Sequence, residues 1–440
     1  MTWRNKDHPI FATGEGGDPN GGYGWVCAVA AAFINAHTWG LNSSYSVFLA
    51  YYLRADIYPN ATSLEFAFIG SLSIACALLV SPLATLAVRE FGTKPTLFLG
   101  VALETASLVC ASFAHKIWHL FLTQGVLFGL GMGFIFVPSV AIIPQWFTTR
   151  RSLANGIAAA GSGIGGLVYS LASGAMIERL GIQWTYRILG IIACVVNTIC
   201  AILLRDRNKI IGSRHVPFDT GLLKRTEYLV LLSYGWFSML GYVVLIFSLA
   251  NYANSIGLNA SQASLASAIF NLGQGLGRPF VGLFSDRTGR INMAGLITSA
   301  SSSFHRRRRY GGGHVLGRRR PVTAEVVGLA DVPAALNLMW LVIALPCAFS
   351  EPMALEIVAG TGKYIGAQLF TGFMFIVAGL LLVVLRGWKI AEIEAIAYAT
   401  HQEPSAVDPT APNGPITEKG QPVHVKKAEM MAKCLKPVRV

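Results

Sequence analysis

The stretch that decides the fold is Gly277-Arg278-Pro279-Phe280-Val281-Gly282-Leu283-Phe284-Ser285-Asp286-Arg287-Thr288-Gly289-Arg290, a mostly apolar segment followed at once by a charged turn. Upstream, the segment stays mostly apolar back to residue 263. About 20 such residues suffice to cross the hydrocarbon core of a membrane. The segment therefore predicts a membrane helix that ends in a tight polar turn at one membrane face.

The composition agrees with a membrane protein. Of the 440 residues, 53% are hydrophobic and only 13% are charged, whereas soluble domains carry about 25% charged residues. The net charge of +13 would suggest a nucleic-acid partner in a soluble protein. Seven of these charges lie in 306–309 and 318–320, and removing them leaves +6 for the rest of the chain. We expect no nucleic-acid partner, because membrane orientation accounts for the remaining excess.

The same length test finds ten runs that can each cross a membrane. They cover residues 24–50, 65–88, 95–114, 118–143, 153–177, 184–204, 228–250, 263–285, 334–357 and 364–386. An eleventh run, 291–304, is too short to cross. The polar leader 1–22 is predicted to be a cytoplasmic tail.

Basic residues concentrate on one side of these spans. If residues 1–22 are cytoplasmic, the turns after the second and eighth spans and the polar break at 205–227 all fall on the basic, cytoplasmic side. Two Asn-x-Ser/Thr sequons, at Asn60 and Asn259, both fall on the opposite side. Glycosylation takes place on that outer side, so both are predicted acceptors.

The polar break also divides the chain in two. It predicts an N-terminal half at 23–206, a cytoplasmic linker at 207–227 and a C-terminal half at 228–388, followed by a disordered cytoplasmic tail at 389–440. The turn Arg89-Glu90-Phe91-Gly92-Thr93-Lys94 after the second span is echoed by the turn at 286–290 after the eighth. Parallel repeats of this kind occur in many transporters.

The turn 286–290 resembles the signature loop of the major facilitator superfamily. In that family the loop latches the two halves in one state of the transport cycle, and the resemblance assigns this gating role to Asp286, Arg287, Gly289 and Arg290. Gly22-Tyr23-Gly24-Trp25, and Gln145-Trp146-Phe147 ahead of the glycine run 156–166, are similar to the monocarboxylate porters, especially their fungal branch. The resemblance covers nearly all of residues 18–390. It implies an all-α fold of two six-helix halves.

Arg278 is the one basic residue well inside a predicted span. An intramembrane arginine must face a partner or a wet cavity, and its planar fork fits a carboxylate. We interpret it as a substrate-carboxylate clamp, as the matching arginine is in monocarboxylate porters; a structural ion pair is the alternative. Polar or aromatic positions that could line the same cavity are Gln274, Asn271, Asn42, Ser43, Trp39 and Tyr234, although helix packing explains each equally well.

Two acids lie well inside predicted spans, Glu104 and Glu351. Intramembrane carboxyl groups serve as proton carriers in pumps and transporters, so both are candidates for proton coupling. Here the sequence departs from the animal porters, in which an acid stands at position 274 and a lysine stands within 42–44. A partner role for Arg278 and a polar contact between helices remain alternatives for both acids.

The C-terminal half is disrupted at 305–320. Only 30 residues separate Arg290 from Pro321, too few for the ninth and tenth spans that the resemblance implies. The fold prediction is therefore a major facilitator whose second half lacks spans nine and ten. We interpret 305–320 as the product of a shifted reading frame or a mispredicted intron; a genuine basic cytoplasmic loop is the alternative.

These observations predict a secondary active transporter that moves a small organic molecule, a monocarboxylate, by alternating access. Glu104 and Glu351 are the candidates if transport is coupled to protons. An exporter of a secondary metabolite and a non-transporting copy are the alternatives. The cysteines show no paired spacing and the glycine runs follow no strand, so we expect no cofactor, no metal and no enzymatic activity. We expect a multi-pass monomer in contact with membrane lipid, in the plasma membrane or alternatively the vacuolar membrane.

Overall fold

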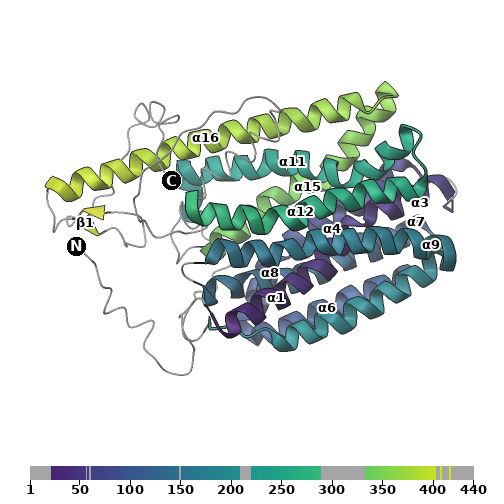
Figure 1. The fold of residues 1–440 in the computed structure, drawn as a ribbon, viewed down its shortest axis with the longest axis horizontal. Helices are drawn as coiled ribbons and strands as arrows, with labels where there is room; N and C mark the ends of the chain where they lie inside the picture. The colour runs from purple at the N-terminus through teal and green to yellow at the C-terminus, as the bar shows by residue number, and fades with distance from the viewer. Residues whose placement is uncertain are drawn as a thin grey trace.

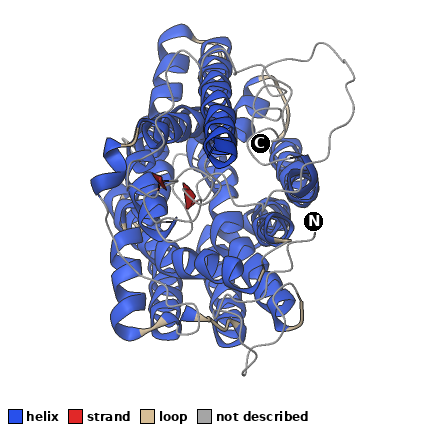
Figure 2. Cartoon of the chain, turned by 90° about the vertical axis from the view of Figure 1, so that its left-hand side faces the viewer, coloured by secondary structure: helices blue, strands red, loops and turns tan. Residues whose placement is uncertain are grey.

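The computed structural model describes residues 21–55, 57–58, 61–147, 150–208, 220–288, 332–402, 407–408 and 416–417. The described part is a bundle of long helices that run side by side (Figure 1), and the view along the bundle shows many of them end-on (Figure 2). The strands described are β1 (Val407–Asp408) and β2 (Ile416–Thr417), a short antiparallel pair. The all-α prediction is therefore confirmed.

The N-terminal half contains four helical runs before its last long helix. The first run is α1 (Tyr23–Asn35), η2 (Ala36–Gly40), α2 (Leu41–Ser43) and α3 (Tyr45–Ala55). The second is α4 (Ser63–Leu79) and α5 (Ser81–Phe91), the third is α6 (Thr93–Ala111), and the fourth is α7 (Ile117–Leu120), η3 (Phe121–Leu127) and α8 (Phe128–Trp146). The half ends with α9 (Arg151–Leu203).

The remaining described helices belong to the C-terminal half. They are η4 (Thr220–Lys224), α11 (Thr226–Ser255), α12 (Ala260–Thr288), α15 (Val332–Thr361) and α16 (Ile365–Gln402). Six of the described helices are long and apolar enough to cross a membrane, or seven if the bent pair α4 and α5 is one span. Each of the ten predicted runs falls on a helix or helical run, so the chain is a multi-pass integral membrane protein.

Two glycines turn the chain where consecutive spans meet. Gly92, between α5 and α6, has φ of 91°, and Gly181, inside α9, has φ of 78°. A positive φ is easily adopted only by glycine. Gly181 therefore breaks α9 into two segments, which match the predicted spans 153–177 and 184–204.

Helices of the two halves pack against one another along their length. α12 lies against α9, α15 lies against α4, and α11 touches α3. One hydrophobic cluster includes residues of both halves, such as Phe48 and Phe247, while separate clusters lie within each half. Thr85 of α5 and Asn337 of α15 exchange hydrogen bonds of 2.9 and 3.2 Å. The halves are thus in direct contact.

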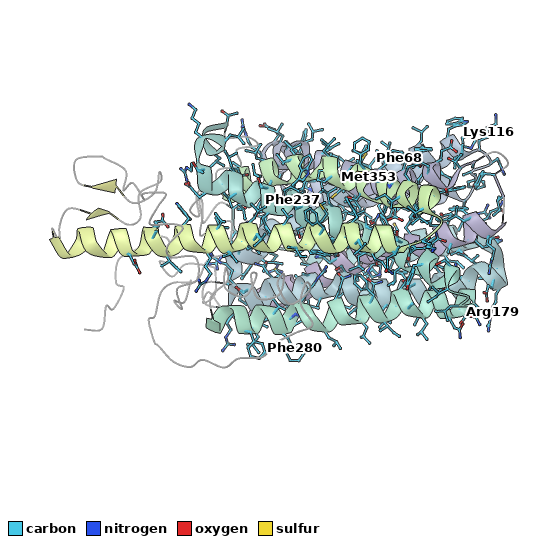
Figure 3. The ribbon with its side chains drawn as sticks, turned by 90° about the horizontal axis from the view of Figure 1, so that it is seen from above. Phe68, Lys116, Arg179, Phe237, Phe280 and Met353 are labelled. Carbon is cyan, nitrogen blue, oxygen red and sulfur yellow. The ribbon has the colours of Figure 1, made fainter. Side chains whose placement is uncertain are left out.

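The bundle has two distinct ends. Lys116 and Arg179 lie at the same end, and α16 extends beyond the opposite end (Figure 3). The prediction of a disordered tail from residue 389 is wrong at its start, because α16 continues to Gln402. Its run of Ala, Glu and Ile favours a helix, and Lys389 pairs with Glu392 across one turn at 2.5 Å.

Several predictions fall on residues that the structure does not describe. The disrupted segment 305–320, the absence of spans nine and ten, and the residues Gly289, Arg290 and Asn60 all lie outside the described residues. Asp286 and Arg287 end α12, but their side chains are not described. The gating motif therefore stays a prediction.

Candidate functional site

Arg278 reaches from α12 across to the N-terminal half. Its Nη1 donates to the Ala159 carbonyl oxygen of α9 at 2.7 Å and to the Ser162 hydroxyl. Its Nη2 donates to the Gln274 Oε1 at 2.7 Å and to the Tyr242 hydroxyl of α11 at 3.1 Å. One guanidinium therefore joins three helices and both halves.

Among the described residues, no neighbour neutralises the charge of Arg278. All four of its hydrogen-bond partners are uncharged, and no carboxylate among the described residues pairs with it. The side chain is half-buried. Because an unpaired intramembrane cation is costly, an anion bound beside Arg278 would be stabilised there.

Gln274 supplies a second donor next to the guanidinium. Its Oε1 accepts from both Arg278 and the Tyr242 hydroxyl, the latter at 2.9 Å. Its Nε2 is buried and meets no acceptor in the described part of the chain. A carboxylate at this place could accept from the guanidinium and from the amide, since each carboxylate offers two acceptor oxygens.

Close packing of α9 and α12 holds Arg278 against α9. A Cβ on Gly163 would lie 2.2 Å from the Gly275 nitrogen, and one on Gly282 would lie 2.5 Å from the Ser152 oxygen. Such distances require glycine, because any side chain would force the backbones apart. The glycine run of α9 is therefore a packing surface in this conformation.

Ser43 and Asn271 lie together at Gly166, and Asn271 precedes Arg278 by seven residues on α12. A Cβ on Gly166 would lie 2.4 Å from the Ser43 Oγ and 2.5 Å from the Asn271 Oδ1. Ser43 donates to the Gly40 carbonyl at 2.9 Å, and Asn271 donates to the Ser267 carbonyl at 3.0 Å. These two predicted site residues thus meet at the contact between the halves, with their donors bonded to their own helices.

Asn42 lies away from that contact and inside the N-terminal half. Its Nδ2 donates to the Ser73 Oγ at 2.5 Å. Both residues line a small cavity together with Tyr45, Gln124 and Tyr186 among others. The structure therefore separates Asn42 from its neighbour Ser43.

Trp39 contributes to an aromatic path between the halves. Its ring lies 5.3 Å from that of Phe136, which lies 5.8 Å from the ring of Trp340 on α15. Its Nε1 is buried and, among the described residues, meets no acceptor. Tyr234 packs elsewhere, against the cluster that contains Leu231 and Leu385.

The two acids, Glu104 and Glu351, are buried, and each accepts hydrogen bonds from groups other than Arg278. Glu104 of α6 accepts from the Asn197 Nδ2 at 2.8 Å. Both oxygens of Glu351 on α15 accept from the Ser248 hydroxyl of α11, at 2.8 and 3.0 Å. Neither bonds to Arg278. Within the described residues, no three His, Cys, Asp or Glu side chains gather to hold a metal ion.

The sequence prediction included Gln274 but missed the other described partners of Arg278. Tyr242, Ser162 and the Ala159 carbonyl were not among the predicted site residues, and they depend on how α9, α11 and α12 pack. Tyr242 lies near the middle of the span 228–250, which directly precedes the span that contains Arg278. Consecutive spans run antiparallel and often pack together, so this position could have suggested Tyr242 as a neighbour of Arg278. Nothing in the local sequence points to the Ala159 carbonyl.

A bundle of apolar helices in two packed halves is the architecture of many integral membrane transport proteins. The Major Facilitator Superfamily profile matches residues 27–301. The probable transporter MCH2 of Saccharomyces cerevisiae is 32% identical over 412 residues, which cover 87% of each chain. The chain therefore belongs to the major facilitator superfamily.

Other relatives have names that describe different kinds of transport. Monocarboxylate transporter 12 of Homo sapiens is 25% identical over 424 residues, covering 83% of this chain and 80% of the relative. The agnestins efflux protein AgnL12 of Paecilomyces divaricatus is 24% identical over 364 residues, covering 79% of this chain and 83% of the relative. The relatives thus include both a monocarboxylate transporter and an efflux protein.

Proposed function

We propose that this chain is a secondary active transporter that moves a small organic anion, a monocarboxylate, by alternating access of its two halves. The observation that carries the proposal is Arg278, a cation at the contact between the halves whose described partners are all neutral. A substrate carboxylate would accept from the guanidinium and from the Gln274 Nε2. Because Arg278 bonds to α9 as well as α11 and α12, binding there would respond to movement between the halves.

The name of the human relative agrees with this substrate class. The efflux protein among the relatives supports a second candidate, the export of an organic acid made by the cell. The two candidates differ in direction and share the carboxylate contact. Uptake into vesicles of both orientations tests transport in either direction.

The test is uptake of labelled lactate or pyruvate into proteoliposomes that contain the full chain. A hydrogen bond to a charged group contributes about 1.5–3 kcal/mol, and each 1.4 kcal/mol is about tenfold in affinity. Arg278→Ala should therefore raise the half-saturating concentration by about 10–100-fold. Arg187→Lys is a matched control, because Arg187 lies away from the site and contacts Ser112, Phe113 and Trp184.

Equal uptake by wild type and Arg278→Ala would contradict the carboxylate clamp. An absence of uptake for every monocarboxylate tested, in a protein that is folded, would favour the non-transporting copy instead. We also propose that Asp286, Arg287, Gly289 and Arg290 gate the cytoplasmic side, as the resemblance implies. The functional unit under this proposal is the monomer.

A further inference from the structure

A buried acid–amide pair joins two spans of the N-terminal half away from Arg278. Glu104 lies midway along α6 and is 1% exposed, and Asn197 lies in the second segment of α9 and is fully buried. The Asn197 Nδ2 donates to the Glu104 Oε2 at 2.8 Å. No cation pairs with this carboxyl group among the described residues.

The pair leaves two oxygens without donors. The Glu104 Oε1 and the Asn197 Oδ1 are both buried, and in the described part of the chain neither accepts a hydrogen bond. Buried acceptors without donors are uncommon and destabilising. A carboxyl and a carboxamide that share one N–H···O bond can satisfy their two other oxygens with a single proton.

We propose that Glu104 and Asn197 form a proton-binding site. A proton from water forms an O–H bond at the Glu104 Oε1, and this O–H donates to the Asn197 Oδ1. The two planar groups are then joined by two hydrogen bonds, and no buried oxygen of either group is left without a donor. The neutral pair also removes the cost of an unpaired carboxylate in an apolar interior.

The described helices that pack against α6 are α5, α8, α9 and η3. α8 presents the backbone of Gly131, where a Cβ would lie 2.5 Å from the Glu104 nitrogen. α9 carries Tyr169, whose ring meets that of His37 edge-on with 5.6 Å between the ring centroids. η3 carries no titratable side chain, and Arg89 and Glu90 of α5 pair with each other at 3.1 Å, exposed to solvent.

The use of this site in transport depends on the proposed function. A proton held at Glu104 would accompany the anion if opening of the N-terminal half exposed the pair to water. Proton binding itself does not require a substrate. The two ideas can therefore fail separately.

The test is infrared spectroscopy of the purified full chain in lipid, which detects the C=O stretching band of a protonated carboxyl group. Wild type should show such a band in neutral buffer, and it should shift in heavy water. Glu104→Gln should remove the band while keeping the fold, because a glutamine Nε2 can donate to the Asn197 Oδ1 in place of the O–H. Asn197→Leu should move the band to higher frequency, since the acceptor of the O–H is lost.

Glu351→Gln is the matched control, because Glu351 is equally buried but both of its oxygens accept from Ser248. The Glu104 band, defined by its loss in Glu104→Gln, should persist in this variant. The absence of that band from wild type, or identical carboxyl bands in wild type and Glu104→Gln, would overturn the proton site. Uptake without the band would overturn the site alone, and the band without uptake would overturn the proposed function alone.

Discussion

At the scale of the residue, Arg278 and Gln274 act as a unit. Gln274 holds one face of the guanidinium with its Oε1 while its Nε2 stays without an acceptor among the described residues. The neutral amide orients the cation without cancelling its charge. An acid at position 274 would make the same contact and would also neutralise the charge of the guanidinium.

Gln274→Glu should weaken the binding of a monocarboxylate. The new carboxylate would lie within bonding distance of the guanidinium, since the glutamine oxygen is already at 2.7 Å, and it would compete with the substrate for the same cation. Two unit charges about 4 Å apart attract each other by about 4 kcal/mol at an effective dielectric of about 20, and part of that attraction is offset by desolvation of the pair. A net loss of about 1.4 kcal/mol or more, which is about tenfold or more in affinity, is therefore expected relative to Gln274→Met. Titration calorimetry with lactate measures the difference. Equal affinities in the two variants would show that the charge of Arg278 is not used.

At the scale of the element, the pair α9 and α12 sets the position of the site. Their glycines allow backbone contact at Gly282 near the end of α12 and at Gly163 near the middle of the first segment of α9. This contact, and not the loop sequence, brings the Ala159 carbonyl and the Ser162 hydroxyl to Arg278. The packing of these two helices thus belongs to the site.

Gly163→Ala should destabilise the protein. The added Cβ would lie 2.2 Å from the Gly275 nitrogen and 2.6 Å from the Asn271 oxygen, so the two backbones must separate. Overpacking of this kind costs roughly 1–3 kcal/mol. The measurement is the thermal unfolding temperature in detergent, which should fall.

Gly273→Ala is the control for that substitution. Gly273 lies on α12, and a Cβ there would meet no atom within 4 Å. Alanine favours a helix by about 1 kcal/mol relative to glycine, so Gly273→Ala should unfold at the same temperature as wild type or higher. A similar fall in both variants would show that the α9–α12 contact is not tight.

At the scale of the whole molecule, the sequence predicted more of the fold than of the site. Apolar runs of spanning length locate the helices because a membrane leaves few alternatives for the backbone, and Gly181 breaks α9 where two of those runs meet. The site depends on contacts between distant segments. The sequence alone points to Arg278 because a charged residue inside a span is rare. Tyr242 and Ser162 belong to residue types that are common in spans, so the sequence does not single them out. Asn42 and Tyr234 are predicted site residues only because they are polar or aromatic residues inside spans. In the structure Asn42 bonds to Ser73 and Tyr234 packs in another cluster.

The orientation of the bundle gives a prediction at Asn259. Asn259 is exposed and precedes α12, where it and Gln262 exchange hydrogen bonds of 2.8 and 3.0 Å. A Cβ on Gly174 would lie 3.1 Å from the Ser264 Oγ, so α12 begins near the end of the bundle where Arg179 lies. We propose that this end faces away from the cytoplasm, toward the cell exterior or the lumen of the organelle, and that Asn259 carries a glycan.

Endoglycosidase treatment of the protein expressed in yeast should increase its mobility, and Asn259→Gln should reduce that change. Ser261→Ala should have the same effect, because it removes the sequon while leaving Asn259 and Gln262 in place. If the change in mobility is the same in both variants as in wild type, Asn259 is not glycosylated and the proposed orientation loses this support.

The most direct test of the carboxylate clamp compares lactate with lactamide, which differ in the charged group. Titration calorimetry on the full chain in lipid should show that wild type binds lactate about 10–100-fold more tightly than lactamide, because only lactate pairs with the Arg278 guanidinium. Arg278→Ala should bind the two compounds with equal affinity. A preference for lactate that is as large in Arg278→Ala as in wild type would contradict the account.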